Sequence, residues 1–276
     1  MAFPDEKSFA DAESPVTGSK MRLQKFLARC GAGGRRRCET FIADGRVEVN
    51  GAVVTEMGVQ VDPSRGVITL DGTRMTLPQE DAVIALNKPA GCYTTMSDQK
   101  GRFCVADLLP LDTYPSLYHV GRLDRDTTGV ILFTMDGELG NYLLHPSHHV
   151  EKEYIAQVRR VPTEEELERI RQGITIRHGE RVHHCAPAKA ELLRKLPRSL
   201  AAQDSCLDPS IPNTSFVRIS IHEGINHQVK LMMGAIGHAV VKLHRTRFGS
   251  VECGKLPCGE WRELSPEEVA ALWQSA

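Results

Sequence analysis

A loop-like segment crowded with charge leads directly into an apolar stretch near the middle of this 276-residue chain. Residues 121–130 read Gly-Arg-Leu-Asp-Arg-Asp-Thr-Thr-Gly-Val, and Ile-Leu-Phe follows at 131–133. The apolar run predicts a buried strand, which anchors the polar segment at the border of a core. Packing gives no reason for two carboxylates, two arginines and two threonines in one loop, whereas a carboxylate between basic side chains stays ionised. We therefore predict that this segment carries chemistry.

The first part of the chain predicts a disordered leader followed by a small helix–helix–hairpin unit. Residues 1–20 are polar and acidic, and they lack the basic start and apolar core of a signal peptide. The first helix is indicated by apolar side chains at helical spacing, namely Leu23, Phe26, Leu27 and Cys30. A second short helix follows it, and Asn50-Gly51 between two β-prone runs is then a strong hairpin signal. We assign residues 21–72 to this unit and the polar residues 73–81 to a linker.

A second and larger domain is predicted over residues 82–276. Helices are indicated by a capping box that opens at Thr163, by a segment near residues 228–236 and by Ser265-Pro266. Candidate strands cover residues 83–87, 130–134, 154–158 and 216–221. Because strands dominate and the helices are irregularly interspersed, the expected class is α+β, with a mixed, mainly antiparallel sheet flanked by helices. The polar stretch over residues 196–214 predicts a surface loop.

The composition is that of an ordinary globular protein. The net charge of −1 does not indicate nucleic-acid binding by the whole chain, so any such signal must be local. The eight cysteines include no Cys-x-x-Cys pair, and adjacent histidines at 148–149 and 183–184 would point to opposite faces of a strand. We therefore expect no metal and no cofactor. Reduced thiols and the lack of an apolar run of ~20 residues favour a cytoplasmic protein without a membrane span.

The small N-terminal unit supplies a local positive charge. Its expected RNA-binding side chains are Arg22, Lys25, Arg35, Arg36, Arg37 and Arg46. Three consecutive arginines at the start of a helix oppose the helix dipole, and a phosphate bound there would relieve the conflict. A solvated charged face is the alternative, and the residues alone leave both interpretations open.

This unit resembles the S4-type RNA-binding domain of ribosomal proteins and RNA-modifying enzymes. The resemblance rests on residues 22–28, on Arg36-Arg37 and on residues 45–51. One departure is Gly34, where the family pattern commonly has serine, and this change predicts a weaker cap on the second helix.

The second domain resembles the pseudouridine synthases, and more specifically the RsuA/RluB type that modifies ribosomal RNA. Four blocks stand in the family's order, at residues 86–91, 121–129, 149–154 and 223–230. The match spans most of residues 83–265. After the last block the chain has Leu231 and Met232, where the family usually carries another basic residue, so RNA contact is expected to be weaker or shifted there.

The resemblance implies roles for individual residues. Asp124 would be the catalytic carboxylate that attacks a uridine flipped out of its stack, Tyr154 would lie against the uracil, and Lys230 would pair with Asp124. Arg122 would hold the flipped nucleotide or contact phosphate, and further RNA contacts are expected from Lys88, Asn226 and Gln228. The residues themselves also fit a plain turn role for Asp126 and a core role for Tyr154.

We expect a monomeric two-domain enzyme that isomerises one or a few uridines of ribosomal RNA, free or in a pre-ribosomal particle. A non-catalytic RNA-binding or ribosome-assembly factor is the alternative, and the intact set of Asp124, Tyr154 and Lys230 argues against it. A metalloenzyme that uses the histidines and cysteines is a third hypothesis. The sequence leaves the target open, because the catalytic motifs lean toward the small-subunit type and the N-terminal unit toward the large-subunit type.

Overall fold

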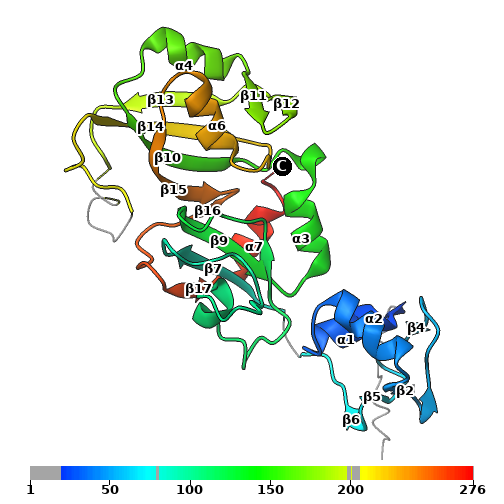
Figure 1. Cartoon of the computed structure of the whole chain (residues 1–276). Coiled ribbons are helices and arrows are strands. Elements are labelled where there is room, and N and C mark those ends of the chain that lie inside the picture. Colours follow the sequence, from blue (N-terminus) through cyan, green and yellow to red (C-terminus); the bar gives the residue numbers. More distant parts are fainter. Residues whose placement is uncertain (1–19, 79–80, 198–199, 201–205, 276) are drawn as a thin grey trace, which may run out of the picture. The chain divides into compact units, whose positions relative to one another are not determined.

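The computed structural model describes residues 20–78, 81–197, 200 and 206–275 (Figure 1). The chain divides into two compact units between Pro78 and Gln79. Apart from Lys20, the leader predicted over residues 1–20 lies outside the described residues. Both units combine helices with mainly antiparallel strand pairs, so the α+β prediction is confirmed.

The N-terminal unit packs two helices against short strands. The helices are α1 (Leu23–Arg29) and α2 (Arg35–Ala43). The sheet runs in the order β3 (Ala52–Val53), β2 (Val47–Val49), β5 (Ile68–Leu70) and β6 (Thr73–Arg74), while β1 (Met21–Arg22) pairs with β4 (Gln60–Val61). Leu23, Phe26 and Leu27 are buried as the helical spacing predicts, whereas Cys30 is only half-buried.

Two hairpin turns set the register of this sheet. Asn50 and Gly51 have φ values of 53° and 80°, and Asp71 and Gly72 have φ values of 50° and 76°. Two consecutive positive φ angles are what a type I′ turn requires. The second turn folds β6 back onto β5, so the start of the linker predicted over residues 73–81 belongs to the sheet instead.

The start of α2 lacks a side-chain cap. Gly34 occupies the N-cap position with φ −62° and ψ 153°, and a Cβ there would meet nothing within 4 Å. Serine would offer a hydroxyl to the first turn and would also restrict the unfolded chain. We therefore expect Gly34→Ser to stabilise this unit by about 0.5–1 kcal/mol in chemical denaturation. Gly34→Ala restricts the chain without adding a hydroxyl, and equal stability of the two variants would contradict the capping explanation.

In the described part of the second unit, nine strands form one sheet. Its main order is β13 (Lys189–Leu193), β14 (Thr214–Ile221), β10 (Lys152–Arg159), β15 (Val240–Phe248), β9 (Thr128–Thr134), β7 (Val83–Lys88) and β17 (Trp261–Glu263). At its sides β8 (Tyr118–Val120) pairs with β9 and β16 (Val251–Glu252) with β15. β9 and β15 run parallel, and the other described pairs of this sheet are antiparallel. A separate hairpin joins β11 (Thr175–His178) to β12 (Arg181–His184).

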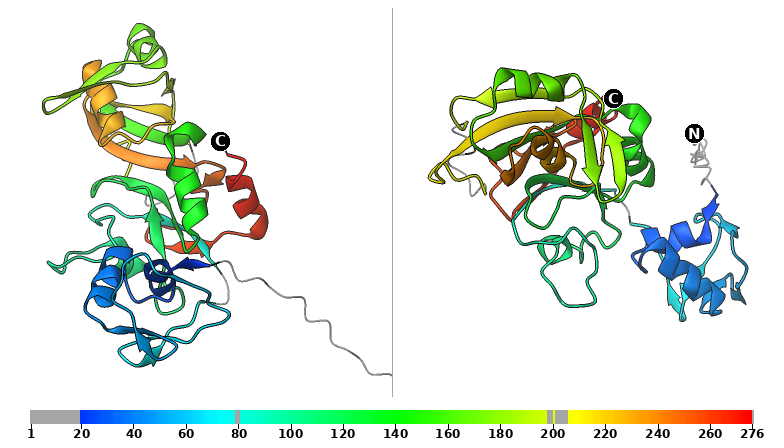
Figure 2. Two further views of the ribbon diagram at one scale, coloured as in Figure 1. Left: turned by 90° about the vertical axis from the view of Figure 1, so that its right-hand side faces the viewer. Right: turned by 45° about the horizontal axis from the view of Figure 1, so that its top comes forward.

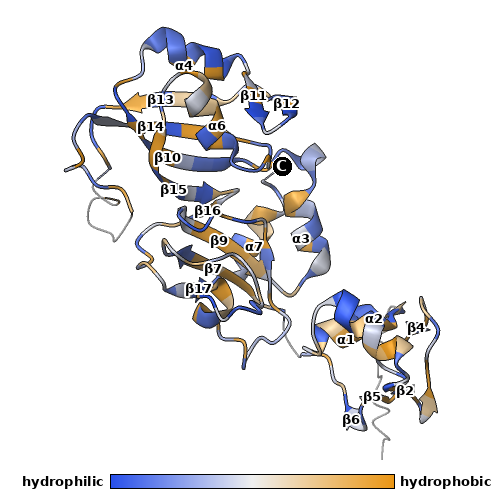
Figure 3. Cartoon of the chain, viewed as in Figure 1, coloured by the Kyte–Doolittle hydropathy of each residue, from blue (hydrophilic) through white to orange (hydrophobic). Residues whose placement is uncertain are grey.

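Helices cover both faces of this sheet (Figures 1 and 2). The helices are α3 (Gly137–Leu144), α4 (Glu164–Arg171), α6 (Gln228–Ala235) and α7 (Pro266–Leu272). α4 and α6 bury apolar side chains in one core cluster, and α3 and α7 do so in another that includes β9. The apolar strand β9, all of whose residues are buried, lies between these layers (Figure 3). The predicted capping boxes at Thr163 and Ser265 are both present. Among the described helices, none is long and apolar enough to cross a membrane.

The segment over residues 196–214 is not simply a surface loop. Leu200 and Leu207 are buried in a cluster with Ile155 of β10. Gln157 of the same strand donates a hydrogen bond to the Asp208 carbonyl at 2.6 Å. The described part of this segment therefore covers a face of the sheet, which its polar composition did not reveal.

β9 and β15 approach each other closely at one glycine. Gly129 stands opposite Arg245 in the parallel register and has a φ of 106°. A Cβ at Gly129 would lie 2.2 Å from the Arg245 carbonyl oxygen and 2.6 Å from its backbone nitrogen. Only glycine fits this contact. The contact holds the start of β9 against β15 and so positions the end of the preceding loop, which spans residues 121–127.

Candidate active site

Asp124 lies in the loop between β8 and β9 and pairs with a lysine in the first turn of α6. Its Oδ2 is 2.8 Å from Nζ of Lys230, and the two side chains are 23% and 24% exposed. The loop is tied down on both sides of the carboxylate, because Thr94 donates a hydrogen bond to the Leu123 carbonyl and the Thr127 amide donates to the Asp124 carbonyl. The pairing that the family resemblance implied is therefore present, and it orients a partly accessible carboxylate.

Asp126 shares the same lysine. Its two carboxylate oxygens are 2.9 and 3.1 Å from Nζ of Lys230, although its side chain is 74% exposed. Burial acts to raise the pKa of Asp126, but the bond to Lys230 outweighs it and lowers that pKa. Burial likewise acts to lower the pKa of Lys230, and the two carboxylates raise it instead. Asp126 lies in a turn, as expected, and its side chain also binds Lys230.

A histidine also touches the carboxylate of Asp124. Nε2 of His227 is 3.3 Å from Oδ1 of Asp124, and the histidine side chain is 45% exposed. His227 is the N-cap residue of α6. Sequence reasoning missed this contact. The available signal was its spacing of three residues from Lys230, which places two side chains on one side of a helical turn.

Tyr154 lies on β10 beside a buried arginine. The tyrosine is 8% exposed, and its hydroxyl accepts a long 3.4 Å hydrogen bond from Nη1 of Arg245. Arg245, on β15, is 2% exposed, and its Nε donates to the Val130 carbonyl at 2.7 Å. Arg245 thus connects Tyr154 to the strand that follows the Asp124 loop. No sequence signal identified Arg245, because its burial depends on strands that are far apart in the chain.

The three predicted catalytic residues are placed around a common core. Leu123 precedes Asp124 and Val229 precedes Lys230, and both of these apolar neighbours belong to the same core cluster as Tyr154. The core therefore holds the Asp124 loop, the start of α6 and β10 together. The hydroxyl of Tyr154 bonds to Arg245, and Tyr154 is linked to Asp124 and Lys230 through the packing of this core.

Lys88 has a structural role. It is fully buried, and its Nζ donates to the carbonyl oxygens of Pro89 at 2.8 Å, Thr127 at 2.9 Å and Arg125 at 3.4 Å. Burial lowers its pKa to about 8. These bonds tie β7 to the loop that carries Asp124. Its burial contradicts the prediction that Lys88 contacts RNA.

Gln228 also faces inward. It is 3% exposed, its Oε1 accepts from the Ile225 amide at 3.2 Å, and its Nε2 donates to Glu223 at 2.6 Å. The side chain therefore closes the turn before α6, and the prediction of RNA contact by Gln228 is wrong. Asn226 in the same turn is exposed and remains a candidate for RNA contact.

The other candidate RNA contacts lie at the surface. Arg122 is exposed and stands two residues before Asp124. In the N-terminal unit the exposed members are Arg22, Arg35, Arg36, Arg37 and Arg46, while Lys25 is half-buried. Arg46 pairs with Asp71 at 2.5 Å and lies over the ring of Phe41, so its charge is partly compensated within the unit.

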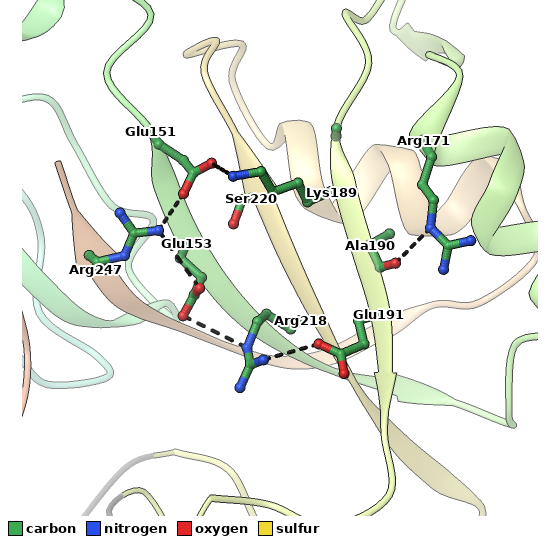
Figure 4. Close-up of a pocket in the computed structure, with 10 residues that line it drawn as sticks. Glu151, Glu153, Arg171, Lys189, Ala190, Glu191, Arg218, Ser220 and Arg247 are labelled. Atoms are coloured by element: carbon green, nitrogen blue, oxygen red, sulfur yellow. Dashed lines mark hydrogen bonds and ion pairs between the residues drawn. The ribbon is translucent and has the colours of Figure 1, made fainter. Parts of the chain in front are cut away.

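A cavity of about 500 Å³ lies beside the strands β10, β13, β14 and β15 (Figure 4). Its charges pair with one another: Lys189 and Arg247 bind Glu151, and Arg218 binds Glu191 at 3.0 Å. None of the predicted catalytic residues lines it. We therefore place the candidate active site at Asp124, where the acidic and basic groups remain partly accessible.

Within the described ranges, no group of three or more His, Cys, Asp and Glu side chains is arranged to hold an ion. His183 and His184 occupy adjacent positions of β12, and adjacent residues of a strand point to opposite faces.

Removal of the Lys230 charge is expected to impair the site strongly. Lys230→Met leaves Asp124 and Asp126 without their shared cation, so Asp124 keeps only its longer contact with His227. We expect a loss of about 100-fold in kcat for the reaction of this site. Lys255→Met, which changes an exposed lysine elsewhere in the domain, is the control. If Lys230→Met had a wild-type kcat, Lys230 would have no role in the reaction of this site.

Comparison with known proteins agrees with this arrangement. Residues 82–235 match the RNA pseudouridylate synthase family, and residues 21–67 match the S4 domain. The chain is 40% identical over 268 residues to an uncharacterized RNA pseudouridine synthase of Mycobacterium tuberculosis, covering 96% of this chain and 98% of the relative. It is 40% identical over 254 residues to the ribosomal large subunit pseudouridine synthase B of Bacillus subtilis, covering 91% and 95%.

A solved structure shows the same fold. A crystal structure of a pseudouridylate synthase superimposes with a TM-score of 0.61 at 30% identity, covering 91% of this chain and 99% of that one. The fold and the site thus define an RNA-modifying enzyme with an S4 domain at its N-terminal end. The chain belongs to the RNA pseudouridylate synthase family.

Proposed function

We propose that this enzyme converts one or a few uridines of large-subunit ribosomal RNA to pseudouridine, with Asp124 as the attacking carboxylate. The observation that carries the proposal is the 2.8 Å pairing of a partly exposed Asp124 with Lys230, on the loop that matches the family's central motif. The large-subunit target is supported by the Bacillus subtilis relative, whose name specifies that subunit.

The proposed reaction is an isomerisation. Asp124 attacks the uridine at the base or at the ribose anomeric carbon, and the bond between N1 and C1′ breaks. The uracil rotates, C5 bonds to C1′, the proton on C5 leaves, and N1 gains a proton while the carboxylate is released. Atoms and electrons balance without a redox partner, and the carboxylate acts as a covalent nucleophile. The target base must first leave its stack.

The surroundings supply further parts of the mechanism. Tyr154 lies against the flipped uracil, and Arg122 and Asn226 contact the flipped nucleotide or its phosphates. The exposed arginines of the S4 unit hold RNA through its phosphates, which predicts binding that weakens as salt increases. With ribosomal RNA as substrate, the enzyme acts in the cytoplasm, and we propose a monomer as the acting form.

A map of modified sites tests the proposal. Ribosomal RNA from cells with and without this gene is labelled chemically and read by primer extension. We expect one or a few pseudouridines to be missing without the gene, and purified protein to restore them on the unmodified RNA. Sites that are lost in cells and not restored by pure protein would favour the alternative, a non-catalytic assembly factor.

A further inference from the structure

The two carboxylate oxygens of Asp124 have different partners. Oδ2 is 2.8 Å from Lys230, which carries a charge at neutral pH, and Oδ1 is 3.3 Å from Nε2 of His227. An ionised carboxylate only accepts hydrogen bonds, so Nε2 must carry a proton for this contact to bind. The neutral imidazole with its proton on Nε2 meets this need, and so does the imidazolium.

The backbone holds His227 in a conformation that few residues adopt. Its φ is 57° and its ψ is 22°, which is the left-handed region. Histidine tolerates this region better than most side chains. Strain of this kind persists where the surrounding structure fixes it, and it gathers at functional sites. The conformation therefore supports a role for His227 beyond the start of a helix.

Titratable groups from three elements face His227. The carboxylates of Asp124 and Asp126 come from the loop, and Lys230 comes from the same helix as the histidine. From β11, the ring of His178 lies edge-on with its centroid 5.7 Å away. Because Nε2 of His227 is in contact with Oδ1 of Asp124, a change of charge on His227 acts directly on Asp124.

We propose that His227 is a positioning residue: it holds Oδ1 so that Asp124 faces the target nucleotide, and its protonation slows the attack. A charge-assisted hydrogen bond is roughly twice as strong as a neutral one. Protonated His227 and Lys230 therefore bind both oxygens tightly and reduce the electron density available for bond formation. Neutral His227 orients the carboxylate with a weaker bond. This inference rests on the proposed role of Asp124.

Rates measured against pH test the proposal. Pseudouridine formation by the full-length protein is followed from pH 5.5 to 8.5 on large-subunit RNA from cells without the gene. His227→Gln keeps an N–H donor that cannot become charged. In His227→Asn the asparagine tolerates the left-handed backbone conformation, but its side chain is too short to reach Asp124. His184→Gln removes an exposed histidine of β12 that lies outside these contacts and is the matched control.

We expect the wild-type kcat to fall at least about fivefold between pH 8 and pH 6, and the His184→Gln kcat to follow it. The His227→Gln kcat should change less than about twofold over that range. At pH 8, His227→Asn should lose about tenfold in kcat with an unchanged KM, because the carboxylate is misplaced and RNA binding is not. If the plots of kcat against pH for wild type and His227→Gln superimposed, or if His227→Asn had a wild-type kcat, this inference would be wrong and the proposed function would stand. A wild-type protein that is inactive at every pH overturns the proposed function and this inference with it.

Discussion

Asp124→Asn is expected to lower kcat for pseudouridine formation by about 10⁴-fold or more. The amide has nearly the same shape as the carboxylate and can still accept a hydrogen bond from Lys230, but it cannot form the covalent bond. Because the side chain is partly exposed and Lys230 keeps Asp126, we expect the unfolding midpoint and the Kd for RNA to stay close to wild type. Single-turnover assays, thermal unfolding and a binding titration measure the three quantities.

Asp126→Asn is the matched comparison, because it removes the other carboxylate that binds Lys230. Its side chain is mostly exposed, and the 3.3 Å contact with Nε2 of His227 belongs to Asp124, so we expect a loss of about tenfold or less. The reverse order of the two losses would assign the chemistry to Asp126. Equal and small losses would show that neither carboxylate is the nucleophile.

Gly129→Ala is expected to destabilise the catalytic domain by about 3–5 kcal/mol. The added Cβ would lie 2.2 Å from the backbone oxygen and 2.6 Å from the backbone nitrogen of Arg245, which cannot rotate away as a flexible side chain could. Relief would require β9 and β15 to separate, and this pair links the two halves of the sheet. The expected fall in the unfolding temperature of this domain is about 10 °C.

Gly259→Ala separates the clash from the cost of the backbone angle. Gly259 has a φ of 85°, but a Cβ there would meet nothing within 4 Å. We expect it to cost about 1–2 kcal/mol, which is the penalty of a left-handed residue by itself. If both variants unfolded at the same temperature, the close approach of β9 and β15 would have no measurable role in stability.

Local features of the fold were predictable because they depend on neighbouring residues. Asn50-Gly51 requires positive φ angles, and Thr163 caps its own helix, so each effect acts within a few positions. The same holds for the apolar run of β9, whose burial follows from its own composition. The pairing of Lys230 with Asp124 came instead from the family resemblance, since 106 residues separate the two.

The errors concern side chains whose surroundings come from distant segments. Lys88 and Gln228 look like surface contacts in the sequence, but each finds enough hydrogen-bond partners to be buried. Burial of Lys88 is tolerable because three carbonyl oxygens accept from its ammonium group. Arg245 was missed for the same reason, because its partners Val130 and Tyr154 lie on other strands.

The sequence by itself determined the two units, the α+β class, the helix caps and hairpin turns, and the motif that carries Asp124. These properties arise from spacing, propensity and local hydrogen bonds, which act over a few residues. Only the tertiary structure decided that Asp126 shares Lys230, that His227 contacts the second oxygen of Asp124, and that Lys88 binds a carbonyl oxygen of the loop. Such contacts depend on how the strands and α6 pack around one core. They join residues that are far apart in the chain, so local sequence patterns do not predict them.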